Sequence, residues 1–348
     1  MTDTSPWWDP ARHNDRRPFL MARNVVRRAL QDWFDAQGFT EVAPAALSLS
    51  PGNEAHLHGF QTTLLHPDGR SAPRYLHTSP EFAMKKLLAA GETRIHAFAH
   101  VWRNREAGPL HSPEFTMLEW YRADAPYDAV IDDTVALIAA AAAALGARSL
   151  QYRDRRCDPA APPERLTVAD AFARHAGIDL LATCHADGTT DRAALAAECA
   201  ANGIATAPDD TWSDIVSKVL TGHVEPHLGQ GRITILDRYP AAEAALARRT
   251  PDDPRTAERF EVYACGVELA NGFGELTDAA EQRRRFEAEM DEKQRVYGHR
   301  YPLDEEFLAA LAHMPEASGV AMGFDRLVML ASGAPTIDHV LWTPISRL

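Results

Sequence analysis

The sequence lacks long apolar runs and any sign of a targeting segment. No apolar stretch in the 348 residues reaches about 18 residues, the length that spans a membrane, and the Ala-rich stretch 135–145 is too short. Residues 1–8 do not combine a basic segment with a following apolar one, as a signal peptide would. We therefore predict a cytoplasmic protein with no membrane partner.

The sequence also has few cysteines, and its net charge is negative rather than positive. Four cysteines are scattered at positions 157, 184, 199 and 265 without the C-x2-C spacing of zinc sites, so we expect free thiols rather than a disulfide framework. The formal net charge is −13, whereas proteins that grip long stretches of nucleic acid usually carry a basic surface. This balance disfavours tRNA as a partner, although a local basic patch stays compatible with it.

Two common nucleotide motifs are missing as well. Neither GxxxxGKS/T nor GxGxxG occurs, so the sequence supports neither a P-loop nor a Rossmann nucleotide site. What is present is an ordinary balance of 45% hydrophobic and 24% charged residues, which is typical of a soluble globular protein.

Hydrophobic periodicity, caps and turn residues predict a mixed succession of helices and strands. Helices are expected over residues 19–38, 80–90, 128–145, 279–297 and 324–330. Strands are expected over residues 39–42, 74–77, 96–103, 115–122, 260–267, 268–276 and 319–322. The strands 96–103 and 115–122 predict an antiparallel hairpin whose long polar tip we interpret as functional. A Pro-rich break and helical patterns predict a helical insert at about 155–255.

Several charged residues gather near the predicted hairpin and the late strands. They are Arg103, His111, Glu261, Glu268, Glu275 and Arg326. Arginine offers phosphate a planar fork, magnesium binds carboxylate and phosphate oxygens together, and the nearby Phe115 could stack on adenine. Each charge taken singly is better explained as a solvated surface group. Spacing alone therefore leaves a nucleotide-using enzyme as one hypothesis.

Five ordered segments make the hypothesis more specific. Residues 38–44 resemble motif 1 of class II aminoacyl-tRNA synthetases, residues 98–121 (FAHVWRNREAGPLHSPEFTMLEWY) resemble motif 2 of their lysine branch, and residues 319–330 (GVAMGFDRLVML) resemble motif 3. Residues 78–81 and 266–278 resemble amino-acid-site segments of lysyl enzymes. The resemblance implies an α+β fold, with an antiparallel sheet flanked by helices in one catalytic domain over 1–348. It also implies an ATP-dependent aminoacyl ligase that uses Mg²⁺ and forms an aminoacyl-adenylate.

The resemblance implies roles for individual residues. Arg103 matches the arginine that holds the α-phosphate, Arg326 matches the arginine at the far end of the triphosphate, and both are expected to be catalytic. The expected ATP-binding residues are Arg103, Asn104, Arg105, Glu106, His111, Ser112, Phe115, Glu268, Leu269, Gly323 and Arg326. The expected substrate-binding residues are Ser79, Pro80, Glu81, Glu119, Tyr121, Asn271, Phe273 and Glu275. Glu261 and Glu268 are the expected magnesium ligands.

The motif 2 loop departs from the usual pattern. The family places Arg-x-Glu here, whereas this chain has Arg103-Asn104-Arg105-Glu106. Either Arg105 replaces a glutamate near the adenine, or the loop shifts so that Glu106 takes that place. Ser112 also stands where asparagine is common.

The acceptor of the aminoacyl group is predicted from a further resemblance. Motif 1 begins near residue 20, so we expect no N-terminal OB-fold of the kind with which lysyl-tRNA synthetases read the anticodon. Together with the run EWYRA at 119–123, this resembles the elongation factor P lysine ligase family, whose members attach a β-lysine to a lysine side chain of elongation factor P. The implied substrates are (R)-β-lysine or lysine and elongation factor P.

Two alternatives stay open. One is a free-standing lysyl-tRNA synthetase-like enzyme that charges tRNA or another carrier, and the other is an inactive synthetase-like regulator. Motif 1 also implies a homodimer, although Val25, Leu30 and Phe34 would fit an intramolecular core equally well.

Overall fold

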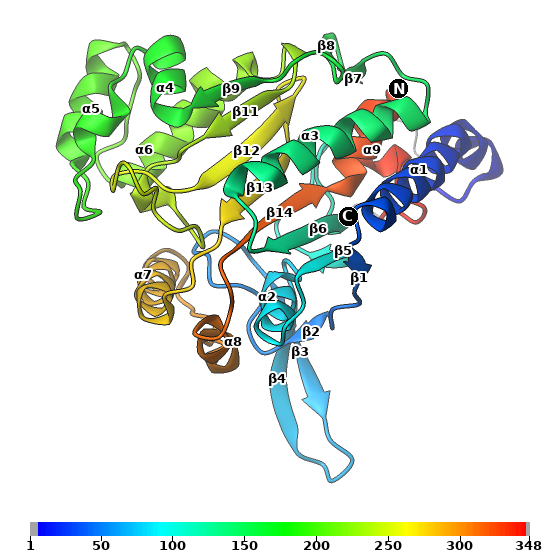
Figure 1. The fold of residues 1–348 in the computed structure, drawn as a ribbon, viewed down its shortest axis with the longest axis horizontal. Coiled ribbons are helices and arrows are strands. Elements are labelled where there is room, and N and C mark those ends of the chain that lie inside the picture. The colour runs from blue at the N-terminus through cyan, green and yellow to red at the C-terminus, as the bar shows by residue number, and fades with distance from the viewer. Residues whose placement is uncertain (1–5, 346–348) are drawn as a thin grey trace.

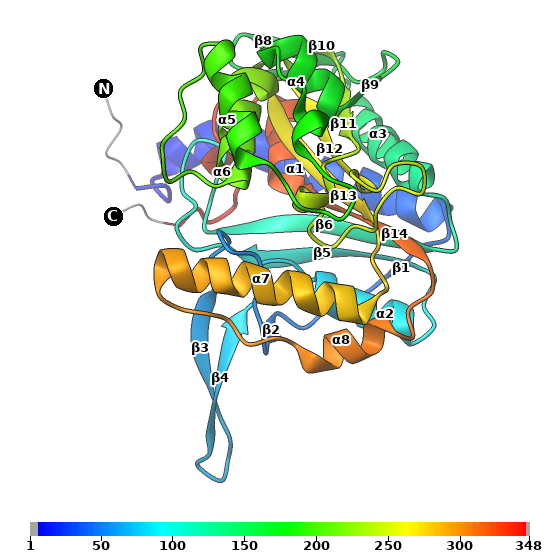
Figure 2. The same ribbon diagram turned by 90° about the vertical axis from the view of Figure 1, so that its left-hand side faces the viewer.

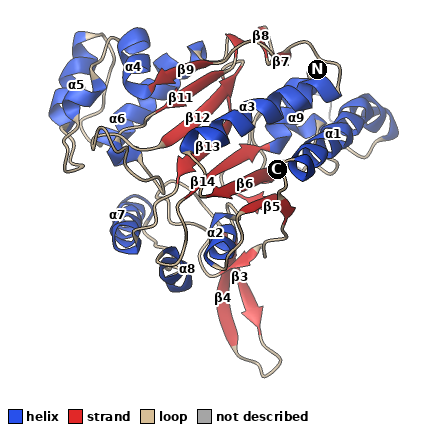
Figure 3. Cartoon of the chain, in the orientation of Figure 1, coloured by secondary structure: helices blue, strands red, loops and turns tan. Residues whose placement is uncertain are grey.

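An eight-stranded mixed sheet forms the centre of the molecule (Figures 1 and 3). The computed structural model describes residues 6–345, so part of the stretch 1–8 lies outside the described residues. In sheet order the strands are β1 (Thr40–Glu41), β5 (Arg94–Trp102), β6 (Glu114–Ala123), β14 (Ala317–Gly323), β13 (Val267–Gly274), β12 (Arg259–Ala264), β11 (Thr234–Asp237) and β9 (Glu164–Thr167). Pairing is antiparallel from β5 to β11 and parallel at the two edges. The predicted α+β fold is confirmed.

Helices cover both faces of the sheet. On one face lie α1 (Pro10–Ala36), α3 (Tyr127–Ala144) and α9 (Phe324–Ser332), which enclose the largest hydrophobic core. On the other face lie α2 (Glu81–Ala89), α7 (Ala279–Tyr297) and α8 (Glu305–Leu311), as Figure 2 shows. The helices α4 (Val168–Ala176), α5 (Arg192–Ala201) and α6 (Trp212–Val219) gather at the β9 end.

The first helix begins earlier than the sequence predicted. Asp9 caps it by accepting hydrogen bonds from the amides of Ala11 and Arg12, and Pro10 occupies the first turn, where proline costs no hydrogen bond. Leu30 and Phe34 are fully buried within this chain. The sequence left open whether these side chains belong to a dimer interface or to the core of one chain. The structure places Leu30 and Phe34 in the core of one chain.

The predicted helical insert at about 155–255 is only partly helical. Its strands β9 and β11 extend the central sheet, while β8 (Arg155–Asp158) and β10 (Gly231–Arg232) join β7 (Leu150–Tyr152) in a small sheet. All four residues of β11 are buried, and so short a buried strand shows no alternation that a sequence pattern could reveal.

A second small sheet was predicted only in part. It contains β2 (Leu47–Ser48), β3 (Phe60–Leu65) and β4 (Ser71–Leu76), and the β3–β4 hairpin projects from the body of the molecule (Figure 1). The short helical turns are η1 (Leu180–Thr183), η2 (Leu220–Val224), η3 (Glu225–His227), η4 (Ala241–Glu243) and η5 (Ile337–His339).

The cysteines and the helix lengths bear on two predictions made from the sequence. All four cysteines are buried and free, as predicted. No helix within residues 6–345 has the length and apolarity that crossing a membrane requires.

Candidate active site

A cavity of about 350 Å³ lies on the sheet face that is turned away from the large core. Most of the predicted ATP and substrate residues line it: Ser79, Glu81, Arg103, Glu106, His111, Ser112, Phe115, Glu268, Leu269, Asn271, Phe273, Gly323 and Arg326. The structure therefore brings together segments that are up to some 250 residues apart in the chain.

Strand register explains why these side chains face one cavity. Glu119, Ala321, Asn271 and Glu261 are successive partners across β6, β14, β13 and β12. Partners in such a row project from the same face of a sheet. A bulge between β12 and β13 pairs Tyr263 with Glu268. The extra residue turns Glu268 to the face of Glu261, since a bulge re-aims the side chains beyond it.

Arg326 stands at one end of the cavity, in the first turn of α9. Its guanidinium donates to the backbone oxygen of Glu268 at 3.0 Å and to that of Leu110 at 3.3 Å. Nη2 lies 2.7 Å from Nε2 of His111, which must accept this hydrogen bond because arginine only donates. Burial and the Arg326 charge lower the pKa of His111, so we infer a neutral ring protonated at Nδ1.

Arg103 follows β5 and reaches the middle of the cavity. Its Nε donates to the backbone oxygen of Thr78 at 3.3 Å, and its guanidinium lies 5.4 Å from the centroid of the Phe115 ring. Within residues 6–345 no carboxylate forms an ion pair with Arg103. Its remaining N–H groups are therefore available to an anionic ligand.

The two predicted magnesium ligands have different surroundings. The carboxylate of Glu261 accepts hydrogen bonds from Arg259 at 2.8 Å and from the Tyr263 hydroxyl at 2.6 Å. The side chain of Glu268 is 40% exposed and lies 3.6 Å from Arg326; burial of the remaining part, together with the charge of Glu261, raises its pKa. Glu225, which sequence reasoning missed, belongs to the same acidic group, because burial, Glu261 and Glu268 raise its pKa to about 7.

These oxygens suit a magnesium ion that shares its shell with phosphate. No group of three or more metal-binding side chains forms a ready cage among the described residues. Mg²⁺ commonly binds through one or two carboxylates plus substrate phosphates; Glu268 lines the cavity, and Glu261 lies on the same face of the sheet with its carboxylate bonded to Arg259 and Tyr263. Among the described residues, the buried Oδ1 of Asn271 also has no hydrogen-bond partner, which leaves it available to a ligand.

Lys85 lies between two carboxylates at the other end of the cavity. Its Nζ is 2.6 Å from Oε1 of Glu81 and 2.6 Å from Oε2 of Glu275. Burial alone would lower the pKa of Lys85, but the two carboxylates together raise it. Burial raises the pKa of Glu275 to about 7, against the opposing effect of Lys85. Sequence reasoning missed Lys85, although the Glu81–Lys85 spacing of four residues on α2 was a signal.

A third carboxylate, Glu119, lies behind Ser79. The Ser79 hydroxyl donates to Glu119 at 2.8 Å, and the Tyr121 hydroxyl donates to the other carboxylate oxygen at 2.5 Å. Burial and the nearby Glu81 raise the pKa of Glu119 to about 8. Predicted residues Pro80, Glu119, Tyr121 and Glu275 thus do not line the cavity themselves but support those that do.

Gly319 keeps this acidic end open. A Cβ atom at this position would lie 2.3 Å from the Tyr121 ring and 2.7 Å from Oε1 of Glu275. Both distances are too short for real side chains, so only glycine fits against this pair.

The motif 2 loop departs from expectation at Arg105. Asn104 pairs through its backbone with His58, and Arg105 adopts a φ of 68° that sends its guanidinium 5.3 Å from the Tyr297 ring centroid. Neither residue lines the cavity, whereas Glu106 does. Of the two alternatives for this loop, the geometry favours the one in which the loop shifts and Glu106 serves.

Other cavity residues carried no sequence signal. They include Glu54, Leu57, Ala245, Leu246 and Arg259. Glu54 and Leu57 come from a loop without a recognisable motif, so only the three-dimensional structure could place them here.

Comparisons with known proteins agree with this geometry. A family model described as tRNA synthetases class II (D, K and N) matches residues 4–347. Proteins from Klebsiella pneumoniae (strain 342) and Edwardsiella ictaluri (strain 93-146) are 38% identical over 349 residues and 37% identical over 354 residues. Both alignments cover 100% of this chain and 100% of the relative. Both relatives are named elongation factor P--(R)-beta-lysine ligase.

Proposed function

The chain belongs to the class II tRNA synthetases of the D, K and N type, in the group of elongation factor P--(R)-beta-lysine ligases, and from this premise we propose its reaction. It activates (R)-β-lysine, or lysine, with ATP as an aminoacyl-adenylate. It then transfers the aminoacyl group to a lysine side chain of elongation factor P.

One observation carries this proposal: the cavity has a cationic end and an acidic end. Arg103 and Arg326 with the neutral His111 suit a triphosphate. At the other end, three carboxylates outnumber the single lysine, and the ammonium groups of a bound substrate would favour the ionised forms of these carboxylates. A lysine-type amino acid brings two ammonium groups, one near each end of its carbon chain. The charge of the pocket therefore matches that of the substrate.

The first step needs no general base. The substrate carboxylate is already ionised when it attacks the α-phosphorus of ATP and releases pyrophosphate. Arg103 stabilises charge on the α-phosphate, and Arg326 holds the far end of the triphosphate, so positioning and electrostatics supply most of the catalysis. Magnesium held by Glu261 and Glu268 supplies further charge neutralisation when bound.

The acidic end orients the amino acid. Glu81 lines the cavity and lies near one amine of the substrate, and Glu275, which Lys85 holds just behind the cavity wall, attracts the ε-ammonium through its charge. Phe273 and Asn271 form the wall along the sheet, and Phe115 provides the adenine with a stacking face, which Glu106 borders.

Two measurements test the proposal. Purified protein should catalyse pyrophosphate exchange that depends on (R)-β-lysine or lysine, and it should add the mass of one such residue to elongation factor P. Absence of exchange with either isomer would contradict the adenylate step. Exchange followed by charging of bulk tRNA, with no mass shift on the factor, would instead support the alternative acceptor.

Assembly and location follow as further parts of the proposal. We propose that two copies associate through the motif 1 face, where a groove lined by Val42, Ala43, Phe98 and Trp102 adjoins the edge strand β1. Light scattering should then give twice the mass of one chain. A reaction on a translation factor belongs in the cytoplasm.

A further inference from the structure

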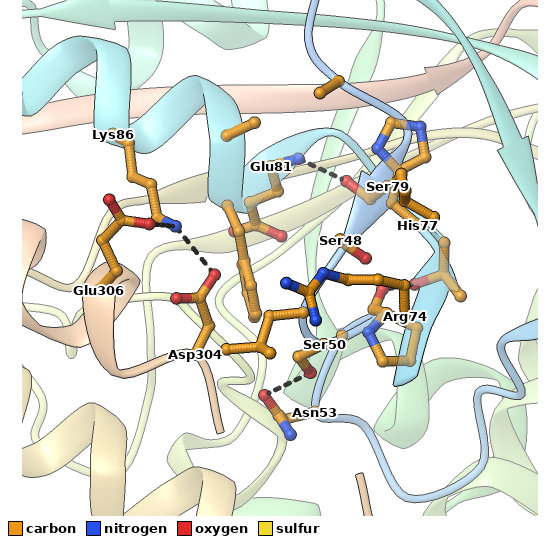
Figure 4. Close-up of a pocket in the computed structure, with 18 of the residues that line it drawn as sticks. Ser48, Ser50, Asn53, Arg74, His77, Ser79, Glu81, Lys86, Asp304 and Glu306 are labelled. Carbon is orange, nitrogen blue, oxygen red and sulfur yellow. Dashed lines mark hydrogen bonds and ion pairs between the residues drawn. The ribbon is translucent and has the colours of Figure 1, made fainter. Parts of the chain in front are cut away.

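A second cavity of about 400 Å³ adjoins the first (Figure 4). The two share Glu54, Ser79, Glu81 and Leu246 as lining residues. The second cavity continues outward between α2 and the segment 45–54, toward Lys86 with its partners Asp304 and Glu306. It uses none of the phosphate-binding residues.

The junction of the two cavities lies next to the reaction centre. Arg103, which holds the α-phosphate in the proposed reaction, donates to the backbone oxygen of Thr78, and Thr78 lines the second cavity. Glu81, at the same junction, marks the amino-acid end. The acyl carbon of the adenylate has to lie between these two groups.

Glu54 is the free carboxylate at this junction. Of the other carboxylates, Glu81 and Glu275 pair with Lys85, Asp304 and Glu306 pair with Lys86, and Glu119 accepts two hydrogen bonds. Within residues 6–345 the Glu54 carboxylate forms neither a hydrogen bond nor an ion pair, and Glu106, also unpaired, lines only the first cavity.

Helix α7 fixes the loop that carries Glu54. The Ala55 amide donates to Glu289 at 2.8 Å, and Lys293 donates to the backbone oxygens of Ala55 at 2.7 Å and Leu57 at 2.8 Å. These bonds hold the backbone that directly follows Glu54, so the loop that carries this side chain is fixed against α7.

We propose that the acceptor lysine side chain enters through the second cavity and that Glu54 removes its proton during aminoacyl transfer. The inference rests on the proposed function. The acceptor arrives as an ammonium group and must lose a proton before its nitrogen can attack. The new C–N bond forms at the acyl carbon while the bond to the phosphate oxygen breaks, and AMP leaves with that electron pair. One proton goes to Glu54, and the second, from the tetrahedral nitrogen, goes to solvent.

The surroundings of Glu54 suit a base. Glu54 is exposed and lines both cavities, and partial desolvation by the cavity walls raises its pKa above the usual value. Among its charged neighbours, Arg103 and Arg259 lower this pKa, and Glu81 and Glu289 raise it. Lys293 is a further charged neighbour, since Glu54 raises the pKa of this lysine. A base with a pKa nearer to neutral accepts a proton from an ammonium group more readily.

The decisive experiment separates the two chemical steps. Adenylate is preformed on the wild-type enzyme and on Glu54→Gln, then mixed with elongation factor P under single-turnover conditions. We expect transfer by Glu54→Gln to fall about 100-fold or more at pH 7, which is the range of general base catalysis. Glu92→Gln, which removes an exposed carboxylate that lines neither cavity, should transfer at the wild-type rate.

The pH profile distinguishes a base from a merely structural residue. Without Glu54 the rate depends on the free amine, so it should rise about tenfold per pH unit toward the lysine pKa. The wild-type rate should be nearly flat from pH 7 to 9. Hydroxylamine, which is unprotonated at neutral pH, should intercept the adenylate equally well in both proteins. Equal transfer rates, or parallel pH profiles, would overturn the assignment of Glu54.

The route has its own test. Ser48→Trp fills the second cavity from β2 without touching the first. We expect exchange and hydroxylamine capture to persist while transfer to the factor is lost. Normal transfer in this variant would overturn the proposed route. Absence of exchange in the wild-type enzyme would instead contradict the proposed function itself.

Discussion

Replacement of Lys85 by methionine tests the charge balance of the acidic end most directly. The side chain of methionine fills nearly the same volume but carries no charge. Lys85 is buried and its Nζ lies 2.6 Å from both Glu81 and Glu275. The variant therefore leaves three neighbouring carboxylates without a cation among them.

The magnitude follows from the burial of this group. Removal of one partner of a buried ion pair costs about 3–5 kcal/mol, because the remaining charge is left uncompensated. With roughly 2 °C per kcal/mol for a chain of this size, the melting temperature should fall by roughly 6–10 °C. The neighbouring Lys86→Met is a control of the same chemistry, since Lys86 is 27% exposed and pairs with the exposed Glu306 as well as with the buried Asp304, so the loss of its charge should destabilise the protein less than the loss of the fully buried Lys85.

Substrate binding gives a second measurement with a defined sign. Lys85 holds down the pKa of Glu275, which is about 7 even with this help. Without Lys85 the pKa rises further, so Glu275 is protonated at pH 7 and no longer attracts the ε-ammonium of the substrate. The KM for lysine or β-lysine in pyrophosphate exchange should increase roughly 10- to 100-fold at pH 7. It should recover as the pH approaches 9.

Two results would refute this reasoning. One is a melting temperature of Lys85→Met within 2 °C of that of Lys86→Met. The other is a KM at pH 7 within about twofold of the wild-type value, which would show that Lys85 does not control the ionisation of Glu275.

Three further predictions concern the two ends of the cavity. Gly319→Ala places a methyl group against Tyr121 and Glu275. Amino-acid-dependent pyrophosphate exchange should therefore fall at least about 100-fold, while the circular dichroism spectrum stays native. Retained exchange would contradict the close fit at this position. Arg326→Lys removes the guanidinium group that reaches Leu110, Glu268 and His111. The KM for ATP should therefore rise roughly 10- to 100-fold. The control Arg284→Lys, at an exposed position, should leave this KM unchanged. The pKa of Glu119 is raised to about 8, so the folded protein keeps a proton that the unfolded chain has lost, and stability should decline from pH 5 to 8. Glu119→Gln cannot titrate, and its melting temperature should decline less over this range than that of the wild type.

The phosphate end of the site could be predicted from the sequence because its residues lie on regular strands and their adjoining turns. Arg103, Phe115 and Arg326 occur in ordered segments that resemble those of a known family, and the structure places all three around one cavity. The bulge that turns Glu268 toward Glu261 could not be predicted, because it depends on the register of two strands rather than on the residues of one.

The missing parts of the fold have a similar cause. The strands β9 and β11 are four residues each, and their positions at the edge of the sheet are stabilised by pairing with each other and with β12. Local sequence contains helical patterns on either side of them, so the prediction of a helical insert at about 155–255 missed these two strands.

The acceptor end shows most clearly where sequence reasoning stops. Adenylate formation uses groups that any carboxylate substrate requires, so its residues form patterns that recur in order along the chain. Deprotonation of an acceptor amine requires only one free carboxylate near the acyl carbon, and one glutamate in a loop forms no pattern. Glu54 becomes a candidate base only when the structure shows that the neighbouring carboxylates are paired with lysines or accept hydrogen bonds. A carboxylate without such partners remains available to accept a proton. The bonds from Glu289 and Lys293 to the loop add the rigidity that such a base needs, and they come from a helix more than two hundred residues away in the sequence.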